Sequence, residues 1–213
     1  MSDSRSFQEV TRDAWKSARL VYRAIENNQA DHDFLCDEIA NDPVLRALWT
    51  PKSFRPQSRA STEEFFHTLR RRPLSVYICL PDINSDSTEV PKPIGFISLR
   101  TEGAEHAQHR SAMLGLSIIG AHQGNGYGPE AINWVLDWAF KFGSLHRVSL
   151  HCHSFNHRGV KLYERLGFTK EGVLRECLWF NRAWHAILVF AMLESEWEAL
   201  QPGGDQAAKT GIV

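Results

Sequence analysis

The sequence predicts one α/β (α+β) domain, with a central sheet of about seven strands flanked by about four helices. Apolar and polar residues alternate in several short runs, as in strands that bury one face. Other segments repeat their apolar residues at spacings of three and four, which is typical of helices packed on a sheet. The chain has 213 residues, of which 43% are hydrophobic and 23% are charged, and this composition suits a single globular core.

The charge balance excludes several classes of partner. A net charge of -1 and a pI near 6.8 create no field that would draw the protein to nucleic acid or to an anionic membrane, so we expect neither partner. The N-terminus has no apolar signal segment, and no window approaches the roughly 18 consecutive apolar residues of a membrane span. We therefore expect a soluble protein of the cytoplasm, with the nucleus left open.

Neither the cysteines nor the histidines form a metal-ligand pattern. The four cysteines are far apart, with no CxxC pair: Cys36, Cys79, Cys152 and Cys177. This spacing argues against a disulfide framework or a zinc site and favours reduced thiols. His151 and His153 share one face of a strand end near His157, but no carboxylate or cysteine is patterned around them to complete a tetrahedral site. We expect no metal.

The first half of the domain is expected to combine a strand, short helices and three further strands. Residues 18–25 alternate as a strand, and residues 31–48 have a helical spacing that residues 41–43 interrupt, so we expect two short helices. Another helix follows, with Ser61 or Thr62 as its N-cap. The next strands are expected at residues 74–80, 94–101 and 111–119, the first two as an antiparallel hairpin with a long connection.

The second half is expected to alternate helices and strands. Residues 126–142 carry an apolar stripe at helical spacing, and Gly143 suits the position after the helix. A shorter helix is capped by Asn156 and stopped by Gly167. The remaining strands are expected at residues 147–152, 169–176 and 184–193, the last two joined through residues 178–183. Residues 1–16 are expected to form an arm, residues 17–194 the domain, and residues 195–213 a loose tail.

A glycine-rich turn links the strand at residues 111–119 to the following helix. Gly124, Gly126 and Gly128 alternate with Asn125 and Tyr127, and the absence of Cβ atoms lets backbone N–H groups point at a bound anion. The helix that begins there adds free N–H groups and the positive end of its dipole, which favour a phosphate. An ordinary strand-to-helix turn is the alternative interpretation.

Two motifs carry a resemblance to a known family. The segment from Gln123 to Gly128 fits Gln/Arg-x-x-Gly-x-Gly/Ala, and residues 156–168, NHRGVKLYERLGF, form an asparagine-led helix ending in Leu-Tyr-Glu-x-Leu-Gly-Phe. Together they resemble the GNAT superfamily of acetyl-CoA-dependent N-acetyltransferases, whose element order fits residues 18–193. Residues 175–181 also resemble the ribosomal-protein alanine N-acetyltransferase branch, although Arg182 departs from its usual Asn-Gly. The resemblance implies a mixed, mostly antiparallel GNAT-like sheet.

The resemblance also implies a coenzyme A site. The turn would hold the pyrophosphate, with Gln123 as an additional neutral donor, and the strand before the turn would separate from its neighbour and pair with the pantetheine arm. Asn156 would be both a helix cap and a hydrogen-bond partner of coenzyme A, while Arg158 and Lys161 would meet the 3′-phosphate or remain solvated. The implied cofactor-binding residues are Leu116, Ser117, Ile118, Gln123, Gly124, Asn125, Gly126, Tyr127, Gly128, Asn156 and Arg158.

Tyr163 is the catalytic residue that the resemblance implies. The family places a tyrosine of this helix beside the thioester sulfur, where a phenol can protonate the leaving thiolate as a general acid. Val160 and Leu166 share its helical spacing, so a core aromatic is the alternative.

The general base is not apparent from the sequence. Met113 stands where related ribosomal-protein and polyamine acetyltransferases often have a glutamate. The upstream loop offers other proton acceptors, and a water relay along the strand backbone is a further alternative. These loop candidates are Glu102, Glu105, His106 and His109.

We therefore expect direct transfer of an acetyl group from acetyl-CoA to a primary amine, either a small molecule or the N-terminus of a peptide or protein. One alternative is a non-catalytic acyl-CoA-binding module of the same fold, and another is a phosphate-binding domain for a different nucleotide. Trp49, Trp179 and Trp184 are either walls of an acceptor pocket or packing residues. A homodimer remains open.

Overall fold

A seven-stranded sheet forms the centre of the protein. The computed structural model describes residues 7–81 and 90–202. The strands follow the order β1-β2-β3-β4-β5-β7-β6, and every neighbouring pair is antiparallel except β4 and β5. This confirms the predicted α/β fold class with a mixed, mostly antiparallel sheet. The strands are β1 (Val21–Ala24), β2 (Leu74–Cys79), β3 (Pro93–Arg100), β4 (Ser111–Ile118), β5 (Arg147–His153), β6 (Thr169–Phe180) and β7 (Ala183–Leu193).

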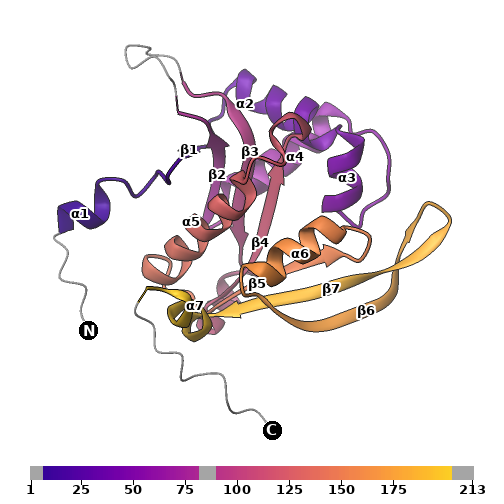
Figure 1. The fold of residues 1–213 in the computed structure, drawn as a ribbon. Helices are drawn as coiled ribbons and strands as arrows, with labels where there is room; N and C mark the ends of the chain where they lie inside the picture. Colours follow the sequence, from indigo (N-terminus) through magenta and orange to yellow (C-terminus); the bar gives the residue numbers. More distant parts are fainter. Residues whose placement is uncertain (1–6, 82–89, 203–213) are drawn as a thin grey trace, which may run out of the picture.

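Helices cover both faces of the sheet (Figure 1). Alternate residues of β2 point to opposite faces, so Val76 and Ile78 join the core beneath α5, while Tyr77 and Cys79 join a second core with α4. No described helix is both long and apolar enough to cross a membrane. The α-helices are α1 (Phe7–Thr11), α2 (Gln29–Asp33), α3 (Pro43–Trp49), α4 (Arg59–Arg70), α5 (Tyr127–Lys141), α6 (His157–Arg165) and α7 (Glu194–Leu200). A π-helix, η1 (Phe34–Ala40), and two 3₁₀ segments, η2 (Ala104–His109) and η3 (Gly120–His122), complete the helical part.

The N-terminal helices agree with the predicted interruption but differ in one cap. The helical part is interrupted at residues 41–43 as predicted, since η1 ends at Ala40 and Asp42 caps α3, with its Oδ1 accepting a hydrogen bond from the Leu45 amide at 2.8 Å. The N-cap predicted at Ser61 or Thr62 is wrong. Ser58 caps α4 instead, since its Oγ accepts from the Ser61 amide at 3.2 Å and the Ser61 and Thr62 side chains already bond back to the Ser58 carbonyl.

The hairpin of β6 and β7 is longer than predicted. Leu178, Trp179 and Phe180 pair with β7, so the expected connection over residues 178–183 is wrong. The chain reverses at Asn181 and Arg182, whose φ angles are +47° and +61°. Two successive residues with positive φ form the tight turn that suits the twist of a hairpin. Figure 1 shows the paired strands extending away from the rest of the sheet.

Both ends of the described chain contact α5. The Trp134 indole donates to the Ala14 carbonyl at 2.9 Å, which holds the end of the expected arm. Helix α7 forms where the sequence predicts the start of a loose tail, because Trp197 packs on Phe140 and donates to Asp137 Oδ1 at 3.2 Å. The rest of the predicted tail, residues 203–213, and part of the long β2–β3 connection, residues 82–89, lie outside the described residues.

The two parallel strands separate halfway along their length. β4 and β5 pair from Ser111 with Arg147 to Met113 with Ser149, and pairing between them ends there. The remainder of β4, Leu114 to Ile118, pairs with β3 alone. The separation that the resemblance implies is therefore present. It leaves one edge of β4 open in the middle of a sheet.

Candidate active site

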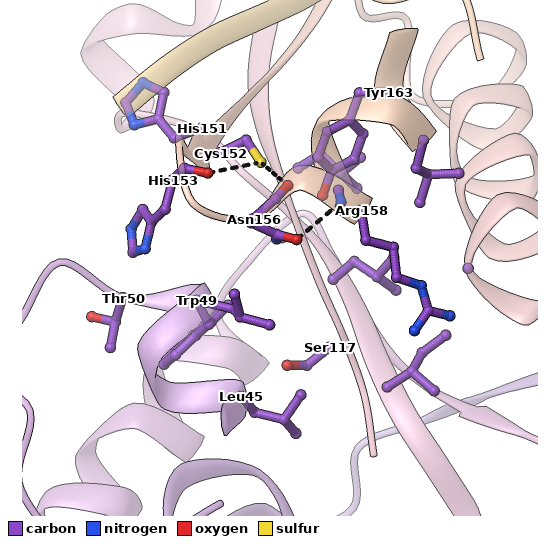
Figure 2. A pocket seen from close by; sticks show the side chains of 18 of the residues that line it. Leu45, Trp49, Thr50, Ser117, His151, Cys152, His153, Asn156, Arg158 and Tyr163 are labelled. Carbon is purple, nitrogen blue, oxygen red and sulfur yellow. Dashed lines mark hydrogen bonds between the residues drawn. The ribbon is translucent and has the colours of Figure 1, made fainter. Parts of the chain in front are cut away.

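A cavity of about 770 Å³ occupies the gap between β4 and β5. One end is formed by the glycine turn and the start of α5, and the other by residues of α3, α4 and the end of β5. Figure 2 shows labelled side chains from α3, β4, β5 and α6 around it. All but one of the predicted cofactor-binding residues line it, namely Leu116, Ser117, Ile118, Gln123, Gly124, Gly126, Tyr127, Gly128, Asn156 and Arg158.

The glycine turn adopts a backbone that favours glycine. Gly124 and Gly126 have φ angles of +89° and +81°, in the left-handed region. A Cβ atom on Gly126 would lie 3.1 Å from Nη2 of Arg19. The Arg19 guanidinium crosses the turn, and its Nη1 donates to the Asn125 carbonyl at 2.9 Å. Arg19 is a residue that the sequence analysis missed, since nothing in its local pattern links it to a turn about a hundred positions away.

Gln123 and Asn125 both brace the turn. The Gln123 side-chain amide donates to the Ile118 carbonyl at 2.8 Å, so one of its N–H groups is already engaged. Asn125 Nδ2 donates to the His122 carbonyl at 3.3 Å, and Asn125 is the one predicted cofactor-binding residue outside the cavity lining. The backbone amides at the start of α5 have no partner within the helix, which leaves them available to an anion.

Asn156 caps α6, as the sequence predicts. Its Oδ1 accepts a hydrogen bond from the Gly159 amide at 2.9 Å (Figure 2). A Cβ atom on Gly159 would lie 2.7 Å from Asn156 Nδ2, so the cap fits closely against a glycine. Gly167, with a φ of +88°, follows the helix as predicted. Asn156 also lines the cavity, so its role as a helix cap is compatible with the expected contact with coenzyme A.

Tyr163 lines the cavity and packs in the core as well. Its ring lies 5.9 Å from that of Phe168 and 6.0 Å from that of Phe190. Figure 2 shows the phenol reaching from α6 into the site. Burial, with a smaller contribution from Cys152, raises the pKa of Tyr163 above its usual value. The hydroxyl therefore keeps its proton at neutral pH, as a proton donor must.

Cys152 also lines the cavity, a position that its sequence pattern does not indicate. Its Sγ lies 3.7 Å from the His153 carbonyl oxygen and 3.9 Å from that of Asn156 (Figure 2). Burial raises the pKa of the Cys152 thiol to about 11. A thiol in this state is a poor nucleophile at neutral pH, because the thiolate is the reactive form.

His151 and His153 share one face of β5, as their spacing predicts, and both line the cavity. His153 Nδ1 lies 2.9 Å from the Ala47 carbonyl oxygen. A carbonyl only accepts, so Nδ1 carries the proton and Nε2 presents a lone pair. Burial lowers the pKa of His153, and burial together with Arg100 lowers that of His151. Both rings are therefore neutral at physiological pH.

The loop residues considered as general bases lie elsewhere. The structure places Glu102 just before η2, and Glu105, His106 and His109 within it; all four are exposed and absent from the cavity lining. Met113 does line the cavity, and its Sδ lies 3.2 Å from Arg100 Nη2.

The three tryptophans separate into two groups. Trp49 lines the cavity and packs against Phe65, with ring centroids 4.9 Å apart. Trp179 and Trp184 are exposed on the β6–β7 hairpin, with ring centroids 5.2 Å apart.

Within residues 7–81 and 90–202, no group of three or more histidine, cysteine or acidic side chains is arranged to hold a metal ion.

Comparison with known proteins identifies the family. A family model for the acetyltransferase (GNAT) domain matches residues 19–169. The chain is 36% identical to the spermidine N(1)-acetyltransferase of Vibrio cholerae over 89 residues, which cover 42% of this chain and about half (51%) of that protein. It is 28% identical to the uncharacterized N-acetyltransferase YoaA of Bacillus subtilis over 163 residues, or 76% of this chain and 86% of that protein. It is 30% identical to YdaF of B. subtilis, a putative ribosomal N-acetyltransferase, over 42% of this chain and 49% of that protein.

A solved structure agrees over a longer stretch. The crystal structure of the V. cholerae spermidine N-acetyltransferase with CoA and spermine superimposes with a TM-score of 0.69 and 26% identity, covering 84% of this chain and 98% of that one. The family-model match extends from just before β1 to the first residue of β6, and it includes both the glycine turn and α6. The chain belongs to the GNAT acetyltransferase family.

Proposed function

We propose that the protein is an N-acetyltransferase that moves an acetyl group from acetyl-CoA directly to a primary amine. The observation that carries this proposal is the continuous cavity that joins the glycine turn, the open edge of β4 and Tyr163. A thioester at the end of a long, amide-bearing arm suits such a site, because the arm can pair with a free strand edge while its phosphates reach the helix N-terminus.

The pyrophosphate, the pantetheine arm and the thioester would each meet suitable groups in this arrangement. The amides near Gly124, Gly126 and Gly128 would hold the pyrophosphate, and Arg158 adds a cation beside Gly124, with Nη2 lying 3.8 Å from a Cβ built there. The unpaired backbone of residues 116–118 would hold the pantetheine amides. The thioester would then lie in the gap between the strands, next to α6.

Tyr163 is the proposed general acid. The amine nitrogen attacks the thioester carbonyl carbon, the carbon–sulfur bond breaks, and the departing sulfur takes the phenol proton. The buried, protonated state of Tyr163 supports this role. The packing of its ring against Phe168 and Phe190 is compatible with it, because packing orients the hydroxyl.

His153 is the proposed general base, in place of the glutamate that Met113 replaces. Its neutral ring, with Nδ1 bonded to Ala47 and a lone pair on Nε2, can take the amine proton directly or through a water molecule. In the sequence, the spacing of this histidine suggests only a possible metal ligand. The signal that distinguishes it is the hydrogen bond to α3, which is apparent only in the fold.

Release of free thiol from acetyl-CoA in the presence of a panel of primary amines tests the function. The panel should include peptides with free N-termini, polyamines and small amines, because the relatives differ in acceptor. We expect amine-dependent thiol release together with the acetylated amine. Tight coenzyme A binding with no release for any acceptor would instead favour the non-catalytic acyl-CoA-binding module.

A thermal-shift series with coenzyme A, ATP and NAD tests the other alternative. We expect coenzyme A alone to raise the melting temperature strongly, since only it has the arm that suits the open edge of β4. Protection by ATP or NAD without protection by coenzyme A would indicate a different nucleotide-binding domain.

A further inference from the structure

The wall of the cavity next to α4 is predominantly cationic. Lys52, Arg72 and Arg100 line the cavity, as do the neutral rings of His151 and His153. Among the lining residues in the described part of the chain, Glu64 is the single carboxylate, and it is exposed on α4. This distribution differs from the near-neutral charge of the whole chain. The cavity therefore offers positive charge at the end opposite the glycine turn.

Arg72 is the least exposed of these cations. Its Nη1 donates to the neutral Ser98 hydroxyl at 2.6 Å, and its guanidinium carbon lies 5.9 Å from the centre of the Phe65 ring. Its Nε is buried and has no hydrogen-bond partner within residues 7–81 and 90–202. In the same ranges, no carboxylate lies within 4.0 Å of the Arg72 side chain.

Two other arginines with limited exposure have acidic partners, whereas Arg46, which is buried outside the cavity lining, donates to the Ser53 carbonyl at 3.0 Å and pairs with no carboxylate among the described residues. Arg23 makes two hydrogen bonds with Asp31, at 2.7 and 2.8 Å, and Arg147 pairs with Glu171. Arg72 lies beside the cavity without such a partner. A partly buried guanidinium without a carboxylate partner is costly, and an arriving anion offsets that cost.

The electrostatic environment supports this interpretation. Burial lowers the pKa of Arg72 to about 10, with a further contribution from the charge of Arg100. Arg100 also lowers the pKa of His151, so the charge of Arg100 acts on both side chains. Arg72 remains charged at neutral pH, and its environment favours any ligand that brings negative charge.

Gly115 leaves space for a ligand at this point. It lies on β4, and a Cβ atom there would be 3.4 Å from Ser98 Oγ and 4.0 Å from Arg72 Nη1. Because glycine has no side chain, the guanidinium faces the strand directly at the edge of the cavity.

We propose that the acceptor is a small primary amine that also carries an anionic oxygen group, a carboxylate or a phosphate, and that Arg72 and Arg100 bind this group. The proposal rests on the proposed acetyl transfer and narrows its acceptor class. A polyamine fits the site poorly, because its second ammonium would lie against the Lys52, Arg72 and Arg100 wall.

Matched pairs of amines test the proposal by thiol release from acetyl-CoA. The pairs are β-alanine with β-alaninamide, phenylalanine with phenylalaninamide, and phosphoethanolamine with ethanolamine; spermidine is added as a polycation. The amides have less basic amines and so a larger neutral fraction, which biases the assay against the proposal. We expect a higher kcat/KM for the anionic member, and the carboxylate and phosphate pairs show which oxyanion is preferred.

Variants identify the binding residue. Arg72→Met should raise KM for the anionic amine about tenfold or more and leave the neutral partner nearly unchanged, while Arg72→Lys should restore part of the affinity. Arg71→Met is the matched control, since Arg71 is exposed, adjacent in sequence and outside the cavity lining. If Arg72→Met does not fold, Arg100→Met provides the same test from an exposed position.

A binding measurement tests the anion site independently of the proposed acetyl transfer. Thermal shifts of the protein with CoA are measured with each probe, so no turnover is needed. Stabilisation by β-alanine but not its amide, lost in Arg72→Met, supports the anion site even if no thiol is released. Equal turnover of both members of every pair, or a preference for spermidine, overturns the anion site and leaves acetyl transfer intact. No thiol release and no difference within any pair overturns both.

Discussion

Arg19 and Glu130 are joined by two hydrogen bonds across the entrance of the glycine turn. The Arg19 amide donates to Glu130 Oε1 at 2.6 Å and its Nε donates to Oε2 at 2.8 Å. Arg19 precedes β1, whereas Glu130 lies in the first turn of α5. The same guanidinium also donates to the Asn125 carbonyl. The pair therefore ties the start of the domain to the backbone that is proposed to hold pyrophosphate.

Replacing Arg19 with methionine should loosen the turn. We expect coenzyme A affinity to fall about fivefold, because roughly 1 kcal/mol of hydrogen bonding no longer orders the turn amides. Isothermal titration with coenzyme A measures the change. Arg59→Met is the control, since Arg59 forms an exposed ion pair with Asp33 outside the cavity lining. Equal affinities for the two variants would show that the Arg19 contact does not order the turn.

Glu130 should make the stability of the protein depend on acid pH. Burial acts to raise its pKa, but the hydrogen bonds from Ser17 and Arg19 outweigh burial and lower the pKa from the ordinary value of 4.5. Because the pKa is lowered in the folded state, ionised Glu130 stabilises the fold. This stabilisation is fully present above pH 4.5 and is lost as the pH falls through the folded-state pKa. Urea unfolding of the wild type and Glu130→Gln should therefore differ at neutral pH and converge in acid. A difference independent of pH would contradict the assignment.

Tyr163→Phe should separate catalysis from binding. The phenylalanine ring keeps the contacts with Phe168 and Phe190 but has no proton to give to the leaving sulfur. We expect kcat to fall on the order of a hundredfold, with coenzyme A affinity and melting temperature nearly unchanged. Steady-state kinetics and titration measure the two effects. An unaltered kcat would assign Tyr163 to packing alone.

His153→Gln should change the pH dependence of turnover. The lowered pKa of His153 keeps the ring neutral at neutral pH, so activity should fall only when the pH drops through a value below the ordinary 6.5. In the variant we expect a reduced kcat/KM at neutral pH and the loss of this acid limb. His157→Gln is the control, because His157 is exposed and outside the cavity lining. Identical pH profiles for wild type and His153→Gln would exclude His153 as the base.

Local motifs were sufficient to predict much of the fold and part of the site. Asn156 and Gly167 bound α6 by short-range hydrogen bonding and a positive φ, which single residues encode. The strands are predictable from the alternation of apolar and polar residues, which is also a local pattern. The β6–β7 turn is not predictable in this way, because neither of the two residues with positive φ, Asn181 and Arg182, is a glycine.

Long-range contacts explain what the sequence did not reveal. Arg19 reaches the turn, His153 bonds to Ala47 across 106 positions, and Arg72, between α4 and β2, bonds to Ser98 on β3. Each contact depends on the sheet order and on the separation of β4 from β5, which no local pattern specifies. Lone polar residues of this kind are indistinguishable in sequence from solvated ones.

The raised pKa of Cys152 has a consequence for the fidelity of the proposed reaction. A thiolate beside the thioester would compete with the amine and become acetylated itself, which would leave a blocked protein. Burial keeps the sulfur protonated, with a pKa of about 11, so it does not capture the acyl group at neutral pH. Burial of the Cys152 thiol therefore also protects the protein from acetylating itself during the proposed reaction.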